Sequence, residues 1–101
     1  MATTPKTLFR GAATTTVGTT LYTTPASTTT VVTNIIVTNT AATSATFTMA
    51  LAGTTIATTI AIAANTSVFI DLKQVLVATN TITGGASAVT VNLQIAGVEI
   101  V

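Results

Sequence analysis

Only five side chains in the 101-residue sequence carry a full charge, so any ionic or acid–base chemistry would have to use them. They are Lys6, Arg10, Asp71, Lys73 and Glu99, which give a formal net charge of +1. Asp71 and Glu99 could act as the carboxylate pair of a glycosidase if the fold brought them together. Asp71 is only two positions from Lys73, however, which favours a local ion pair on a strand. We therefore expect a protein without enzymatic activity.

Several residue types that metal sites and nucleophilic catalysis depend on are absent. The chain contains no His and no Cys, which excludes disulfides and the usual zinc, iron and copper ligands. Without histidine, the many Ser and Thr hydroxyls have no base of the Ser–His type to activate them. Three cations are also too few for a phosphate-binding patch. We expect no metal, no cofactor and no nucleic-acid partner.

Hydrophobic residues make up 49% of the chain, which raises the question of a membrane. No apolar run approaches the roughly 18–20 residues that a membrane-spanning helix requires. The first ten residues also lack the apolar core of a secretory signal. We expect no membrane partner and no Sec-dependent export.

β-Branched residues dominate the sequence, with 28 Thr, 11 Val and 9 Ile. They are stiff at χ1 and fit a pleated sheet better than a helix. Apolar and polar residues alternate along most of the chain, as they do in strands with one buried face. The residues predicted to share one face of each strand are Val31, Thr33, Ile35 and Val37; Ala45, Phe47, Met49 and Leu51; Ile56, Ile60 and Ile62; Val68, Ile70 and Leu72; and Val89, Val91, Leu93 and Ile95.

Glycines and a parity change predict where strands turn or bend. Ala52–Gly53 and Ala64–Asn65 indicate turns, and Gly84–Gly85 predicts a two-residue hairpin turn. After Gly97 the apolar positions shift, which predicts a bulge or a bend at that glycine. A weak helical signal covers residues 72–78, where residues 72–75 could form a single helical turn. With about seven to eight short strands, the pattern predicts an all-β antiparallel β-sandwich, Ig-like or jelly-roll-like.

Residues 1–18 differ from residues 19–101, which form the predicted sandwich domain. The N-terminal segment holds two of the three cations and lacks sustained alternation. Leu8 and Phe9 form an apolar spot with a cation on either side. A frayed tail and an extended arm that orders against a neighbouring subunit both fit this pattern. We expect the arm. Its predicted partner contacts are Lys6, Leu8, Phe9 and Arg10.

Threonine is best explained as the outward-facing residue of the strands, because it combines β propensity with an uncharged hydroxyl. A mucin-like stalk would need more than two prolines, and an ice-binding surface would need threonine rows at a fixed repeat, which the sequence lacks. With so few charges, exposed strand edges have little protection against association. The sequence therefore predicts a subunit that other subunits cover.

Three segments resemble parts of small phage virion proteins. Thr19–Thr33 is similar to their opening strand, T-x-Y-x-x-P-A turn and second strand, and residues 34–40 to the strand that follows. Ile82–Glu99 resembles their closing hairpin and G-V-E terminus. The likeness spans roughly residues 19–101. It departs from them at Gly84–Gly85, where similar proteins commonly have bulkier small residues.

The resemblance implies a virus-particle component without catalytic residues. The expected function is a capsid decoration (cement) subunit of a phage head. It would form a homotrimer and contact the major capsid protein or other virion subunits. The alternatives are a neck, collar, tail-fibre or baseplate module and, with less support, a host-surface or glycan-binding module. Sugar binding has less support because Tyr22, Phe47 and Phe69 are interpreted as packing residues. The expected location is the virion, assembled in the host cytoplasm.

Overall fold

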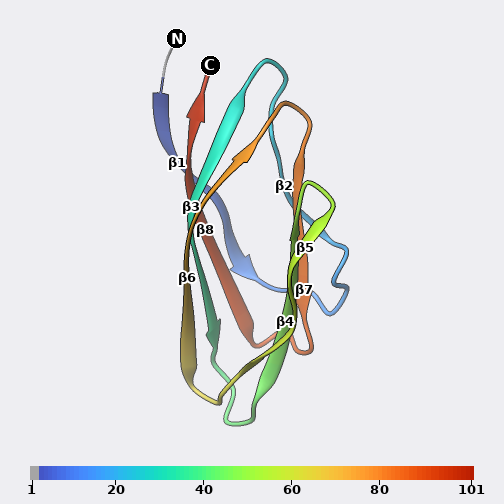
Figure 1. Ribbon diagram of the computed structural model, residues 1–101. Coiled ribbons are helices and arrows are strands. Elements are labelled where there is room, and N and C mark those ends of the chain that lie inside the picture. The colour runs from blue at the N-terminus through green and yellow to red at the C-terminus, as the bar shows by residue number, and fades with distance from the viewer. Residues whose placement is uncertain (1–2) are drawn as a thin grey trace.

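The computed structural model describes residues 3–101, in which eight strands form two four-stranded antiparallel sheets (Figure 1). Sheet A has the strand order β1-β8-β3-β6, and sheet B has the order β2-β7-β4-β5. The strands are β1 (Thr3–Ala12), β2 (Thr20–Thr23), β3 (Thr29–Asn39), β4 (Ala45–Leu51), β5 (Thr54–Ile62), β6 (Thr66–Leu76), β7 (Thr81–Ala86) and β8 (Val91–Ile100). The predicted all-β sandwich is confirmed.

The strands pair in a nested order along the chain. β4 pairs with β5, β3 with β6, β2 with β7 and β1 with β8, so the chain resembles one long hairpin. Successive pairs lie in opposite sheets, and the pairings of β3 with β8 and of β4 with β7 complete each sheet. A long hairpin rolled up in this way is the jelly-roll form of the sandwich.

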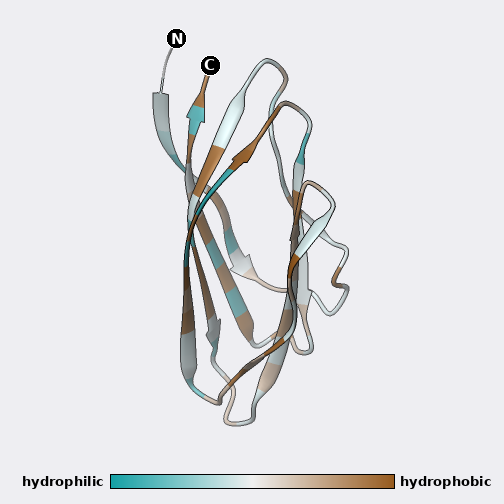
Figure 2. Cartoon of the chain, in the orientation of Figure 1, coloured by the Kyte–Doolittle hydropathy of each residue, from teal (hydrophilic) through white to brown (hydrophobic). Residues whose placement is uncertain are grey.

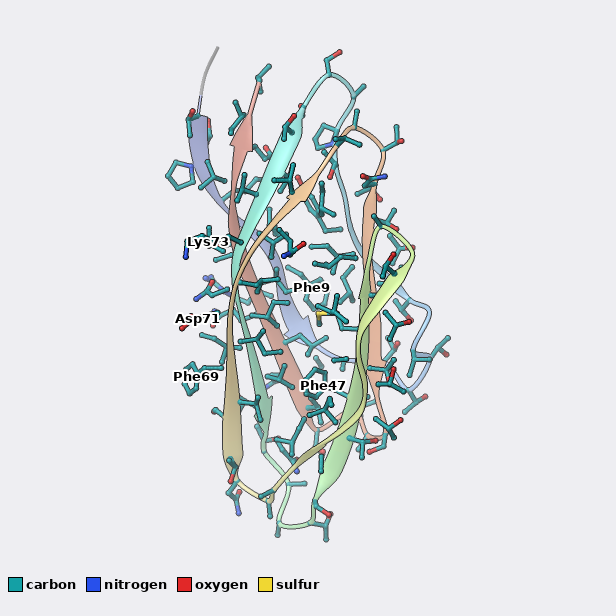
Figure 3. The ribbon with its side chains drawn as sticks, viewed as in Figure 1. Phe9, Phe47, Phe69, Asp71 and Lys73 are labelled. Carbon is teal, nitrogen blue, oxygen red and sulfur yellow. The ribbon has the colours of Figure 1, made fainter. Side chains whose placement is uncertain are left out.

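The hydrophobic core fills the space between the sheets, because one face of each strand points inward. Phe47 and Met49 of β4 are among its largest fully buried side chains, as the alternation predicts. Figure 3 shows Phe9 and Phe47 between the sheets. The prediction that threonine faces outward also holds, since the only buried threonines of the described residues are Thr24, Thr28 and Thr30.

A line of extra residues crosses sheet A at the level of Gly97. β1 and β3 each contain one more residue than β8 there, Leu8 in β1 and Thr33 in β3. The pairing of β3 with β6 shifts at the same level. Such bulges turn consecutive side chains to the same face of a sheet. Sheet A is therefore divided into two halves whose inward positions follow different parities in β1 and β3.

The predicted bulge was placed in the wrong strand. β8 keeps its alternation through Gly97, and its neighbours β1 and β3 carry the extra residues. Val98 and Ile100 are therefore only half-buried, on the outer face of sheet A. In β3 the shift leaves Thr33 exposed and buries Val32 in its place. Gly97 permits this arrangement, because its missing side chain makes room for the carbonyl oxygen of Val31.

The predicted turn at Gly84–Gly85 is wrong, because both glycines lie inside β7. The segment after β1 runs along this strand, and Gly84 and Ala86 donate backbone hydrogen bonds to the carbonyls of Thr19 and Thr14. A Cβ on Gly85 would lie 2.6 Å from the Thr16 carbonyl oxygen. The glycines therefore allow a second backbone to approach β7.

Two other local predictions are wrong because of how the strands pair: the inward face of β5 and the helical signal in β6. Two irregularities in the pairing of β5 with β4, near the positive φ of Thr59, leave Ile56 and Ile60 exposed and bury Ala57. The weak helical signal at residues 72–75 is overridden, since β6 continues to Leu76. Its pairing with β3 supplies the backbone hydrogen bonds that an isolated helical turn would lack.

An extended N-terminal arm is not seen. Residues 3–12 form β1, an edge strand that pairs with β8 along its length. The bulge at Leu8 turns both Leu8 and Phe9 toward the interior, which is how two consecutive apolar residues join the core. Described residues on both sides of the predicted domain boundary at residues 18/19 therefore share sheet A.

Gly97→Ala is expected to destabilise the fold by at least about 2 kcal/mol, because its Cβ would lie 2.5 Å from the backbone oxygen of Val31. Gly18→Ala is the matched control, since a Cβ there meets nothing within 4 Å. Urea denaturation monitored by circular dichroism measures both. Equal stability of the two variants would show that sheet A does not depend on this contact.

Candidate interaction surfaces

The four residues predicted as arm contacts lie on β1 and have different surroundings. Leu8 is 7% exposed and Phe9 packs against the core, so both contribute to the chain's own fold. Lys6 forms an ion pair with Glu99. Arg10 is exposed, and its Nη2 donates a 3.4 Å hydrogen bond to Thr7. Their contact with a partner remains a prediction, for which Lys6 and Arg10 are the exposed groups.

A polar cluster links the two sheets at the end of the sandwich that carries both termini. The Tyr22 hydroxyl from β2 donates to the Glu99 carboxylate of β8 at 2.5 Å and lies 2.9 Å from the Thr30 hydroxyl of β3. Lys6 Nζ lies 3.3 Å from Glu99 Oε2. The side chain of Glu99 is 13% exposed and that of Lys6 is 48% exposed. Tyr22 therefore ties sheet B to a mostly buried carboxylate of sheet A.

This cluster shifts the pKa values of its acid groups in opposite directions. The hydrogen bond from Tyr22, together with Lys6, lowers the pKa of the Glu99 carboxyl. Burial raises the pKa of the Tyr22 hydroxyl, and the bond to Glu99 adds to that rise. At neutral pH the pair is therefore a charged acceptor and a neutral donor, an arrangement that stabilises the fold.

The two carboxylates do not form a catalytic pair. Asp71 lies on the outer face of β6 (Figure 3), whereas Glu99 bonds to Tyr22 of the opposite sheet. The ion pair expected between Asp71 and Lys73 is not formed, and the pair Lys6–Glu99 is the one salt bridge within residues 3–101. In that range no group of three or more acidic, His or Cys side chains could hold a metal. Nor does the described part of the chain contain a helix able to span a membrane.

One half of the outer face of sheet A carries a row of apolar side chains, and in the next row Thr3 and Thr29 lie beside Ile100. At the end that carries the termini, the register aligns Pro5, Val98, Val31 and Val75 in one row across all four strands. Val75 is 59% exposed. We call these four residues and Ile100 the apolar half. Figure 2 shows the corresponding hydrophobic segments of β3, β6 and the end of β8.

Beyond the line of extra residues, the outer face becomes polar. The register there aligns side chains of mixed chemistry across the four strands, and we call them the polar half. Its rows are Thr7, Ala96, Asn34 and Asp71; Arg10, Gln94, Ile36 and Phe69; and Ala12, Asn92, Thr38 and Ser67.

An open hollow of about 400 Å³ lies on this polar half. Arg10, Gln94, Asn92, Thr38 and Ile36 line it. Within residues 3–101 the side chains of Asn92 and Gln94 make no hydrogen bond, so their amides are free to bind a ligand. The hollow thus combines one cation, two amides, a hydroxyl and an aliphatic side chain.

Phe69 has other surroundings than predicted, as has Val89, which was expected on the inward face of the last strand and is 63% exposed in the turn before it. The aromatic ring was interpreted as a packing residue, but it is 71% exposed on the outer side of β6 (Figure 3). The alternation did contain the signal, because Phe69 has the opposite parity to the half-buried Val68 and Ile70. Phe47 is buried as predicted, and Tyr22 packs against the core.

No family model, curated protein sequence or solved structure matches this chain.

Glu99→Gln is expected to remove a pH dependence of stability. Because the folded state lowers the pKa of Glu99, its stabilising effect is present above the unfolded pKa and is lost as pH falls through the folded one. Unfolding free energies at about pH 7 and pH 3 should differ less in Glu99→Gln than in the wild type. Asp71→Asn is the matched control, because Asp71 makes no ion pair or side-chain hydrogen bond within residues 3–101. An unchanged dependence in Glu99→Gln would contradict this role.

Proposed function

We propose that the chain is a non-enzymatic structural subunit of a phage particle, and specifically a capsid decoration subunit. The observation that carries the proposal is the apolar half of sheet A. It is an outward row of apolar side chains that spans four strands in a chain with five charged residues. Exposed apolar patches of this kind are typical of protein interaction sites.

The rest of the surface supports the same proposal. Lys6 and Glu99 neutralise each other, which leaves Arg10, Asp71 and Lys73 as the remaining charged side chains. Such a surface offers little electrostatic repulsion between neighbouring copies. The jelly roll is also an architecture of viral capsid domains, which is an analogy at the level of the fold.

In this proposal, the apolar half is the contact between copies, and a homotrimer is the expected assembly. A cyclic assembly would bury the row of valines and leave the opposite end of the sandwich free. Contacts with the major capsid protein or other virion subunits would then add stability to the shell through binding to the folded state. The neck, collar, tail-fibre and baseplate locations are distinguished from the head by copy number.

A deletion of residues 1–10 would not by itself test the predicted partner contacts of this segment. It would remove most of β1, including Leu8 from the core and Lys6 from the ion pair with Glu99. Loss of particle association could then reflect loss of the fold. Substitutions of exposed side chains are the sharper test.

Val75→Asp is expected to weaken self-association more than tenfold, about 1.4 kcal/mol or more, because it places a charge in the apolar row. Val89→Asp is the matched control, since Val89 is similarly exposed, at 63%, in the turn before β8. Sedimentation velocity measures the oligomeric state of both, and Val75→Thr tests whether loss of apolar character is enough. A wild-type chain that stays monomeric at micromolar concentration would refute self-association through this face.

Mass-spectrometric counting of this chain in purified particles tests the location. A decoration subunit is expected in on the order of hundreds of copies, whereas a neck or tail subunit is expected in about a dozen. A count of about a dozen would favour the neck or tail as the location of the subunit. Absence of the chain from particles would refute it.

A further inference from the structure

We propose that the polar half of sheet A binds an oligosaccharide. The proposal goes beyond the structural role above and does not rest on it. The central row is Arg10, Gln94, Ile36 and Phe69, one residue from each strand of the sheet. A cation, an amide, an aliphatic group and an exposed aromatic ring thus lie in line.

The hydrogen-bonding groups of this surface fit hydroxyl-rich ligands. The amides of Asn92 and Gln94 each donate and accept, as a sugar hydroxyl does, and neither makes a side-chain hydrogen bond within the described residues. Arg10 can only donate, whereas the Asp71 carboxylate in the next row can only accept. A ligand with many groups of both kinds can use all four.

The ring of Phe69 provides the apolar part of such a site. Its neighbour across the sheet is Ile36, which lines the hollow, so the exposed ring continues the hollow toward the edge of the sheet. Pyranose rings have an apolar C–H face that packs on aromatic rings, and the polar edge of the sugar would then reach the amides. From β1 to β6 the row crosses three strand spacings, about 14 Å, which suits a short oligosaccharide.

Other occupants fit this surface less well. A second copy of the chain would need an apolar centre, and that lies in the other half of the face. Nucleic acid would need several cations, and here Asp71 lies on β6 between Lys73 and the row of Arg10. An added peptide strand would pair with a sheet edge and not with its face. The balance of Arg10, Lys73 and Asp71 is one positive charge, which favours sugars that carry a carboxylate.

The test is a binding measurement on the full chain with a glycan array of acidic and neutral oligosaccharides, and a carboxylate-terminated peptide as a separate arm. Backbone amide NMR shifts then map the strongest probe. Binding is expected to shift residues of β3, β6 and β8 in the polar half. Phe69→Ala and Gln94→Ala are each expected to weaken binding at least tenfold, while Arg10→Gln weakens acidic probes more than neutral ones.

Matched controls keep the result independent of stability and assembly. Val89→Ala removes an equally exposed apolar side chain in the turn before β8, and Gln74→Ala removes an exposed amide of β6 outside the polar half. Both should bind as the wild type does. The proposal is overturned by absence of binding across the array, by shifts confined to other surfaces, by binding of the peptide alone, or by full affinity in Phe69→Ala. A virion copy count bears on none of these outcomes.

Discussion

Gly97 lies where the carbonyl oxygen of Val31 and the side chain of Leu8 approach β8 so closely that a Cβ would fall within 3 Å of both. Its two neighbouring strands each accommodate this approach with an extra residue. In β1 the extra residue brings Leu8 and Phe9 into the core together. In β3 it changes which residues face outward. The division of the outer surface into two halves, and the place of Leu8 and Phe9 in the core, both accompany this one close contact.

Regular alternation predicted the strands that carry no extra residue themselves, even where a neighbouring strand does. Phe47 and Met49 in β4 and Leu93 in β8 lie in the core as predicted because the extra residues beside them belong to the neighbouring strands β5, β1 and β3. The predictions failed where the chain meets a second backbone. The pair Gly84–Gly85 has the composition of a turn, and only the passage of residues 14–19 beside β7 explains its place in a strand.

The candidate surfaces were also harder to predict, because they depend on contacts between distant parts of the chain. Ile36 and Phe69 are apolar residues that sequence patterns assign to packing, and their neighbours in the register come from strands far away in the chain. Arg10 and Gln94 are 84 positions apart and become neighbours only when β1 pairs with β8. Local periodicity gives the face of the sheet on which a residue lies. Which residues lie beside it in a row across the four strands depends on the long-range pairing.

The nested pairing determines the order in which the strands can find their partners during folding. β4 and β5 are joined by a short turn and can pair early, whereas β1 has no partner until β8, the most distant strand, has been made. Such distant pairings slow folding and leave an unpaired strand exposed during synthesis. Pro5, which has no backbone N–H to donate, and the charged Lys6 both disfavour pairing of this segment with foreign strands. During translation, β1 is therefore protected against aggregation by features that later fit it to one place at the edge of sheet A.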